Sequence, residues 1–411
     1  MGERALYPGW IVLAAVFTSA MLVIGGSIYC YQLFVIPVTT ELGISRGSAS
    51  NAYVALLVGL AVWSPLAGRM FDRASARTLI GAGGIAYGAG MVALSQLSSP
   101  VWMLVAVFVL LGLGMTIAGG LAANTVTARW FEKRRGRALG IASIASSAGG
   151  FVMIPITTGL IETQGWRTAL LVNGCVIALV IVLLALFVVR DRPEAAFIEA
   201  SDEFAADKEV DNAPVPQWTF AKLLTSKAFW MITAAVGLLL ASDQAVLTSQ
   251  FPFFIDIGLS EGEAATIITT MTGSAIAGKM LVGFLAERYD IRWLYALVAL
   301  FHAGLLGVFL LQPGFWPMLA FVALFGAAVG GIYPVWSVLV SQHFELASFG
   351  VAFGAMALFT QVLAIGFVAY VNRTFDASNS YEPAYAWFLL AIAAGMLAIV
   401  FVGPARKQAA E

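Results

Sequence analysis

Twelve long apolar stretches constrain this 411-residue chain more than any other feature. A helix needs about 20 predominantly apolar residues to cross a bilayer. The stretches lie at 10–36, 48–66, 78–97, 101–127, 138–161, 168–189, 228–254, 264–285, 293–311, 315–341, 350–371 and 384–402. The chain is 11% charged, whereas soluble domains carry about 25% charged residues. We therefore expect an all-α membrane protein with twelve transmembrane helices.

Several classes of function find no support in the sequence. A net charge of −1 argues against nucleic acid as a partner. No Walker motif, His/Cys cluster or nucleophile–base pair is apparent, so we expect no enzyme, no cofactor and no metal site. The first stretch is too long for a cleavable signal peptide and is expected to remain as a spanning helix. Cys30 and Cys175 lie inside apolar stretches and are expected to pack there.

The basic residues predict the orientation in the membrane. With both termini inside, the outer connections hold only Arg46, Arg167 and Arg373, and Lys279 lies within a stretch. The other 18 of the 22 Lys and Arg residues then face the cytoplasm. The positive-inside rule therefore predicts a multi-pass protein of the plasma (inner) membrane with both termini cytoplasmic.

One long connection, 190–227, separates the sixth stretch from the seventh. It carries eight acids, five bases and prolines at 193, 214 and 216, a composition typical of a solvated linker. We expect a six-helix bundle over 1–189, a cytoplasmic linker over 190–227 and a second six-helix bundle over 228–411.

The two halves repeat a charged motif after their second stretch. Each copy has a glycine, an acid four residues later, an arginine directly after the acid and another arginine four residues beyond. The copies are Gly68, Asp72, Arg73 and Arg77 in the first half, and Gly283, Glu287, Arg288 and Arg292 in the second. Two matches at equivalent places indicate a duplicated half.

In this motif the chain resembles the major facilitator superfamily. The resemblance covers essentially the whole chain and implies two six-helix bundles around a central cavity near the membrane midplane. It also implies a monomer.

Within that superfamily, the chain resembles the oxalate/formate antiporter and monocarboxylate transporter group. The matching residues are Gly9-Trp10, Tyr29, Pro37-Val38, Leu42 to Arg46, Asn124-Thr125, Arg129 to Phe131, Gly278-Lys279 and Gly330 to Pro334. The resemblance implies transport of a small organic anion, with a monocarboxylate favoured.

The chain departs from that group at four places. Lys279 stands where relatives usually carry arginine, and Met356 where the oxalate carrier has a second cation. One cation suits a monoanion better than a dianion. Gln250 stands where bacterial lactate carriers place histidine. Gly119-Gly120 replaces an aromatic residue, which predicts either a roomier cavity or closer helices.

Lys279 and Asp243 are the charges deepest inside the apolar stretches. A lysine in hydrocarbon costs several kcal/mol without a partner, a cavity or a function. Lys279 would bind the substrate carboxylate or form a structural ion pair. Asp243 would balance Lys279, load a proton or cap a water-filled cavity. Lys279 lies about 10 Å and Asp243 about 22 Å from the cytoplasmic ends of their helices, so direct contact between them stays open. We expect one of them to exchange a proton during transport.

Five further residues are candidates for substrate binding. Tyr29, Tyr31 and Tyr333 combine a hydroxyl with an apolar wall, and plain packing is the alternative for each, as it is for Trp336. Gln250 and Gln361 are amides in apolar helices, so each should hydrogen-bond across helices or face water. His302 is expected to be structural.

The inner-face charges are candidates for a gate. They are either ordinary topology determinants or a lock that holds the two halves in the outward-open state. The charges are Asp72, Arg73, Arg77, Arg129, Glu287, Arg288 and Arg292. The uncharged Asn124, near the inner end of the fourth stretch, is a further candidate for the gate, with helix packing as its alternative.

Three functions therefore remain from the sequence. The first is a secondary carrier of a small monocarboxylate by proton symport or anion exchange. The alternative is a proton-coupled exporter of amphipathic or drug-like compounds, although helices 1 to 6 lack the acid that such exporters often carry. The third is a membrane sensor or scaffold. The expected partners are the organic anion, protons and the lipid bilayer.

Overall fold

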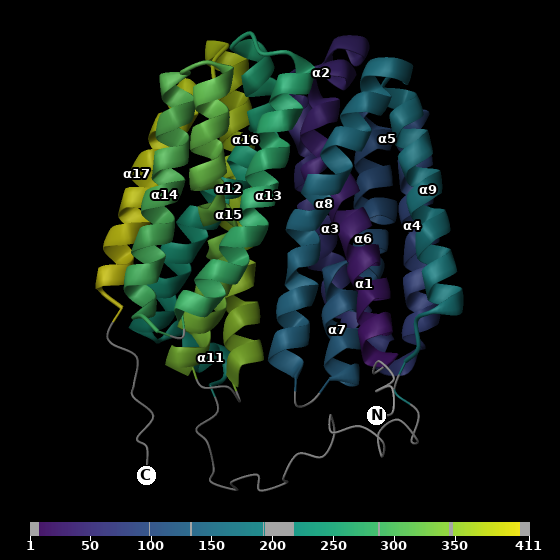
Figure 1. Ribbon diagram of the computed structural model, residues 1–411, viewed down its shortest axis with the longest axis vertical. Helices are drawn as coiled ribbons and strands as arrows, with labels where there is room; N and C mark the ends of the chain where they lie inside the picture. The colour runs from purple at the N-terminus through teal and green to yellow at the C-terminus, as the bar shows by residue number, and fades with distance from the viewer. Residues whose placement is uncertain are drawn as a thin grey trace, which may run out of the picture. The chain divides into compact units, whose positions relative to one another are not determined.

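The computed structural model describes residues 8–402 except 98, 132–133, 192, 194–217, 287 and 345–347. Its regular secondary structure in these ranges is entirely helical (Figure 1). Twelve helices of the described chain are long and apolar enough to cross a membrane. The expectation of an all-α protein with twelve spans is confirmed. The ends differ from the apolar stretches: Arg46–Phe71 runs beyond 48–66, whereas Pro8–Tyr29 ends seven residues before the expected end at 36.

The residues form two compact units. One unit contains Met1–Ile44 and Asn51–Asp211, and the other contains Ser45–Ser50 and Asn212–Glu411. The first turn of the helix that starts at Arg46 therefore belongs to the second unit, and the rest of that helix belongs to the first.

The first unit is built from helices coloured purple to teal in Figure 1. They are α1 (Pro8–Ile24), η1 (Gly25–Tyr29), α2 (Tyr31–Leu42), α3 (Arg46–Arg73), α4 (Ala76–Ser95), α5 (Pro100–Val105), η2 (Ala106–Leu111), α6 (Gly112–Ala118), α7 (Gly120–Trp130), α8 (Arg135–Gln164) and α9 (Trp166–Phe187).

The second unit is built from helices coloured teal to yellow. They are α11 (Phe220–Leu224), α12 (Lys227–Asp256), α13 (Glu261–Ala286), α14 (Ile291–Leu311), α15 (Phe315–Phe344), α16 (Phe349–Ser378) and α17 (Glu382–Val400).

A π-helical turn, η1, interrupts the first span. Its Gly25 packs against Gly149 of α8, since a Cβ added at Gly25 would lie 2.5 Å from the Gly149 carbonyl oxygen. A Cβ at Gly149 would lie 2.4 Å from the carbonyl oxygen of Met21. Small residues allow membrane helices to approach this closely. The two glycines therefore bring the backbones of the first and fifth spans together.

The fourth span is broken in its middle. Gly119 has φ −98° and ψ −139°, outside helical geometry, so α6 ends at Ala118 and α7 starts at Gly120. The freed carbonyl of Ala118 accepts a hydrogen bond of 2.6 Å from the Ser19 hydroxyl of α1. A membrane helix can break where a neighbour satisfies the freed backbone group in this way.

The two glycines at this break have different surroundings. A Cβ at Gly119 would lie 2.3 Å from the carbonyl oxygen of Met115, whereas a Cβ at Gly120 would meet nothing within 4 Å. Gly119 therefore belongs to a tight contact, and Gly120 leaves open space. The contact at Gly119 is with the preceding turn of the same span, so a roomier cavity and closer helices at this glycine pair both stay predictions.

In the second unit, α13 and α15 are in backbone contact. A Cβ at Gly278 would lie 1.9 Å from the carbonyl oxygen of Ala327, and a Cβ at Gly330 would lie 1.9 Å from that of Ala275. Only glycine fits at both places. The contact fixes the part of α13 that carries Lys279 directly against α15.

Candidate functional site

Asp243 on α12 and Lys279 on α13 are near enough for their charges to interact. Both side chains are half-buried. Opposite charges attract much more strongly in a low-dielectric interior than in water. The charge of Asp243 also acts on Tyr333 of α15. Three helices of the second unit thus supply an acid, an ammonium and a phenol to one place.

Helix packing explains why these groups meet. The contact of Gly278 with Ala327 holds Lys279 close to α15. Tyr333 lies six residues after Ala327, somewhat less than two helical turns along α15. Asp243 lies near the middle of α12, which packs against α15 and α13 as well as α16. The two charges therefore interact in this structure, and direct contact between their side chains stays a prediction.

A cavity of about 180 Å³ lies close to this group through Tyr333, although its lining includes neither Asp243 nor Lys279. Gln244, the residue after Asp243, contributes to its wall, and so does Tyr333. The full lining is Leu240, Gln244, Tyr333, Trp336, Phe353, Ala357, Thr360, Gln361 and Ala364. Apolar walls with a few convergent polar groups are typical of small-molecule sites.

Two aromatic rings form one wall of the cavity. Trp336 of α15 stacks on Phe353 of α16 with ring centroids 4.0 Å apart and an interplanar angle of 24°. The Tyr333 ring lies 6.0 Å from that of Trp336. The indole N–H of Trp336 is buried and has no hydrogen-bond partner among the described residues. This wall therefore consists of apolar ring surfaces and one indole N–H donor without a hydrogen-bond partner among the described residues.

The other predicted binding residues lie elsewhere. Gln250 is on α12, seven residues or about 10 Å along the helix from Asp243. It is fully buried, and its amide atoms have no partner within the described region. Tyr29 and Tyr31 belong to the first unit. Tyr29 ends η1, its carbonyl accepting a 3.0 Å bond from Gln32, and the Tyr31 ring lies 5.0 Å from that of Tyr53. Of the six candidates, Lys279, Tyr333 and Gln361 gather in one region.

The described contacts of the predicted gate residues in the first unit stay within that unit. Arg77 donates to the carbonyl of Leu186, and the Asp191 carboxylate accepts from its backbone N–H. Arg129 donates a 2.6 Å bond to the carbonyl of Phe71. Arg73 and Asn124 are exposed.

The second copy of the motif has a similar environment. Arg292 pairs with Asp290 at 2.7 Å, and Arg288 lies over the Phe284 ring at 4.2 Å. Glu287 and the side chain of Asp72 lie outside the described residues. A lock between the halves thus stays a prediction.

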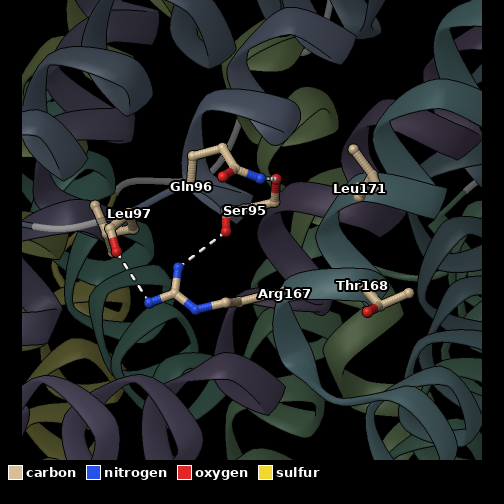
Figure 2. A pocket seen from close by; sticks show the side chains of 6 residues that line it. All are labelled: Ser95, Gln96, Leu97, Arg167, Thr168 and Leu171. Carbon is tan, nitrogen blue, oxygen red and sulfur yellow. Dashed lines mark hydrogen bonds between the residues drawn. The ribbon is translucent and has the colours of Figure 1, made fainter.

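Sequence reasoning missed the partners of two arginines in the connections predicted to face outward. Arg167, at the start of α9, donates to Oε1 of Glu41 from two nitrogens, at 3.0 and 2.8 Å. It also donates to the carbonyls of Ser95 and Leu97, beside a cavity of about 380 Å³ (Figure 2). Glu41 neutralises the charge of Arg167. We therefore assign Arg167 a structural role, in which it connects α9 with Glu41 of α2 and with the end of α4, and not an anion-binding role.

Arg46 is the second of these arginines. It pairs with Asp256 of α12 at 2.5 and 2.8 Å and donates to the Tyr381 hydroxyl at 3.0 Å. Its guanidinium lies 4.0 Å from the centroid of the Phe375 ring. The signal that could have identified both pairs was an acid at the same predicted end of a neighbouring span. Sequence alone could not say which acid.

Comparison with known proteins supports the fold and identifies the protein family. A family model described as Major Facilitator Superfamily matches residues 15–369. The oxalate:formate antiporter of Oxalobacter formigenes is 26% identical over 64% of this chain, and the match spans 58% of that protein's length. Monocarboxylate transporter 12 of Rattus norvegicus is 24% identical, covering 92% of this chain and 82% of that protein.

One solved structure has the same architecture. It is the crystal structure of a bacterial homolog of the human lysosomal transporter Spinster, in an inward-facing and occupied conformation. The TM-score is 0.69 at 18% identity, over 98% of this chain and 96% of that one. At this identity, the likeness concerns the fold alone.

Proposed function

Because this chain belongs to the Major Facilitator Superfamily, a family of membrane transporters, we propose that it carries a small monocarboxylate by alternating access. It is a multi-pass integral membrane protein of twelve spans. The observation that supports the proposal is Lys279, an ammonium inside a span, whose charge interacts with that of Asp243. Intramembrane charges in transporters mark substrate and ion pathways by default.

The charged pair suggests how substrate and proton are coupled. An arriving carboxylate binds Lys279 and replaces Asp243 as the partner of the ammonium. Asp243 would then be a buried, unpaired carboxylate, which is strongly unfavourable. Accepting a proton removes that penalty. One monoanion and one proton therefore enter the site together, and the exchange reverses when the substrate leaves. This is proton symport; anion exchange results if the substrate leaves only when another anion replaces it.

We also propose an orientation in the membrane, an inner gate and an oligomeric state. The distribution of Lys and Arg favours an inner-membrane protein with both termini cytoplasmic and with bundles over 1–189 and 228–411. The two motif copies, with Arg77 and Arg292, serve as the inner gate. The protein works as a monomer, because each substrate needs one site only.

The alternative function has one feature in its favour. An aromatic wall beside an acid also suits an amphipathic cation, as an exporter of drug-like compounds would require. Lys279 argues against it, because the ammonium inside the span repels a cationic guest. The charge of the ligand that binds separates the two functions.

A ligand-stabilisation screen tests the proposal. Purified protein is heated with formate, acetate, lactate and larger monocarboxylates, and with amphipathic amines. We expect a carboxylate to raise the unfolding temperature of the wild type but not of Lys279→Ala. Lys222→Ala, which removes an exposed lysine on α11, is the matched control and should respond as the wild type does. Stabilisation by amines alone, or by carboxylates equally in Lys279→Ala, would overturn the proposal.

A further inference from the structure

We propose that the cavity lined by Tyr333, Trp336 and Phe353 receives a ring on the substrate, so that the transported anion is an aromatic monocarboxylate with a polar substituent. This inference rests on the proposed function and specifies its substrate class. It follows from the size, the walls and the polar groups of the cavity.

The size of the cavity exceeds the needs of the smallest acids. Its volume is about 180 Å³, and an apolar cavity of about 150 Å³ is enough to bind benzene. A formate or acetate ion held at Lys279 would leave this space without contact to its walls, and the dispersion energy of those contacts would be lost. A six-membered ring fills the space.

The shape of the walls also suits a ring. Trp336 and Phe353 stack on each other, so a substrate ring would pack against their outer surfaces, where offset or edge-on packing adds to the gain from area burial. On α16 the lining includes Ala357 and Ala364, seven residues or about two helical turns apart. Their small side chains leave the room that the ring would occupy.

Polar side chains indicate that the ring is substituted. Gln244, Thr360 and Gln361 line the same cavity. The Thr360 hydroxyl donates to the carbonyl of Ala357 at 3.0 Å, so its lone pairs remain as acceptors. A hydroxyl on the ring would find acceptors there. Tyr333 lines the cavity and also interacts electrostatically with Asp243. It therefore connects the cavity with the charged pair.

The experiment compares acids of increasing size in binding to the purified protein, measured by competition and thermal shift. The probes are acetate, lactate, benzoate and 4-hydroxybenzoate. We expect the ring acids to bind at least about tenfold more tightly than acetate, with 4-hydroxybenzoate ahead of benzoate. Ala357→Leu, which fills the cavity, should weaken benzoate by about tenfold or more and leave lactate nearly unchanged. Ala394→Leu makes the same change at an exposed position of α17 and should alter neither.

A second variant covers the case in which Ala357→Leu does not fold. Gln361→Leu should remove the preference for 4-hydroxybenzoate over benzoate without affecting lactate. Binding of lactate and benzoate with equal affinity, or an equal loss of both in Ala357→Leu, would refute the aromatic substrate and leave the proposed function intact. Failure of every carboxylate to bind in a way that depends on Lys279 would refute the proposed function itself.

Discussion

Arg46 and Asp256 form a two-pronged ion pair, with nitrogen–oxygen distances of 2.5 and 2.8 Å. Next to it, the backbone N–H of Gly47 donates to the Asp376 carboxylate at 3.0 Å. One acid therefore holds the first side chain of α3, and another satisfies a free N–H at the start of the helix. Together they explain why Ser45–Ser50 belongs to the second unit.

Removing the acid at 256 should loosen this turn. In Asp256→Asn we expect amide hydrogen exchange at residues 46–50 to accelerate about tenfold, equivalent to about 1.4 kcal/mol, because a charge-assisted bidentate pair is lost. Mass spectrometry of exchanged peptides measures it. Arg373→Gln, at an exposed residue of α16, is the control. Unchanged exchange in Asp256→Asn would show that the ion pair does not hold the turn.

The stability contributed by the Glu41–Arg167 ion pair should depend on pH. Hydrogen bonds from Arg167 first, and from Trp166 second, hold the pKa of the Glu41 carboxyl below its ordinary value of about 4.5. A lowered pKa contributes stability that is complete above the ordinary value and is lost as the pH falls through the lowered one.

Thermal unfolding of wild type and Glu41→Gln should therefore differ at pH 7 and converge as the pH falls below about 4.5. Glu162→Gln, at an exposed acid of α8, should match the wild type at pH 7. A difference between wild type and Glu41→Gln that grows on acidification would contradict the assignment.

The charged pair in the second unit should show strong coupling. Lys279→Met leaves the Asp243 carboxylate without the charge of Lys279, and because both side chains are half-buried the cost should be below the about 3–5 kcal/mol of a fully buried pair. The double variant Asp243→Asn/Lys279→Met removes both charges and should recover most of that loss. A double-mutant cycle on the free energy of unfolding measures the coupling. Additive effects would mean that the two charges do not interact.

Gly278→Ala should destabilise the protein by about 1–3 kcal/mol, because the new methyl group would overlap the Ala327 carbonyl. It should also weaken carboxylate binding, since the neighbouring Lys279 shifts with the backbone. Gly262→Ala is made on the same helix, where a Cβ meets nothing within 4 Å. Equal stability of the two variants would contradict the close contact of α13 and α15.

Gln250→Leu should be neutral or stabilising. A buried amide without a partner costs about 1–3 kcal/mol, and leucine of similar size removes that penalty. Transport should persist if Gln250 lies outside the binding region. Loss of substrate binding with unchanged stability would instead place Gln250 in the substrate path, as its correspondence to a histidine of lactate carriers suggested.

The sequence predicted those features that depend on apolar length alone. Twelve spans follow from stretches such as 228–254, because a bilayer imposes one length on every helix. The π-turn at Gly25–Tyr29 and the break at Gly119 were not predicted. The break depends on which neighbour donates a hydrogen bond to the freed carbonyl of Ala118, and that neighbour, Ser19, is distant in sequence.

The site was predicted in part for a similar reason. Lys279 and Asp243 stand out because charge is rare in apolar helices. The cavity beside them could not be inferred, because it depends on how Trp336 stacks on Phe353 across two helices. Gln250 was selected by correspondence with other carriers, and its burial depends on packing that a linear pattern does not record.

The break at Gly119 gives the first bundle an internal joint. A single residue separates α6 from α7. A change in φ and ψ of Gly119 would therefore change the direction of α7, while the hydrogen bond from Ser19 holds the end of α6. Transport models that treat each half as one solid block omit this degree of freedom. Here the fourth span bends at a point where a methyl group would collide with the preceding turn.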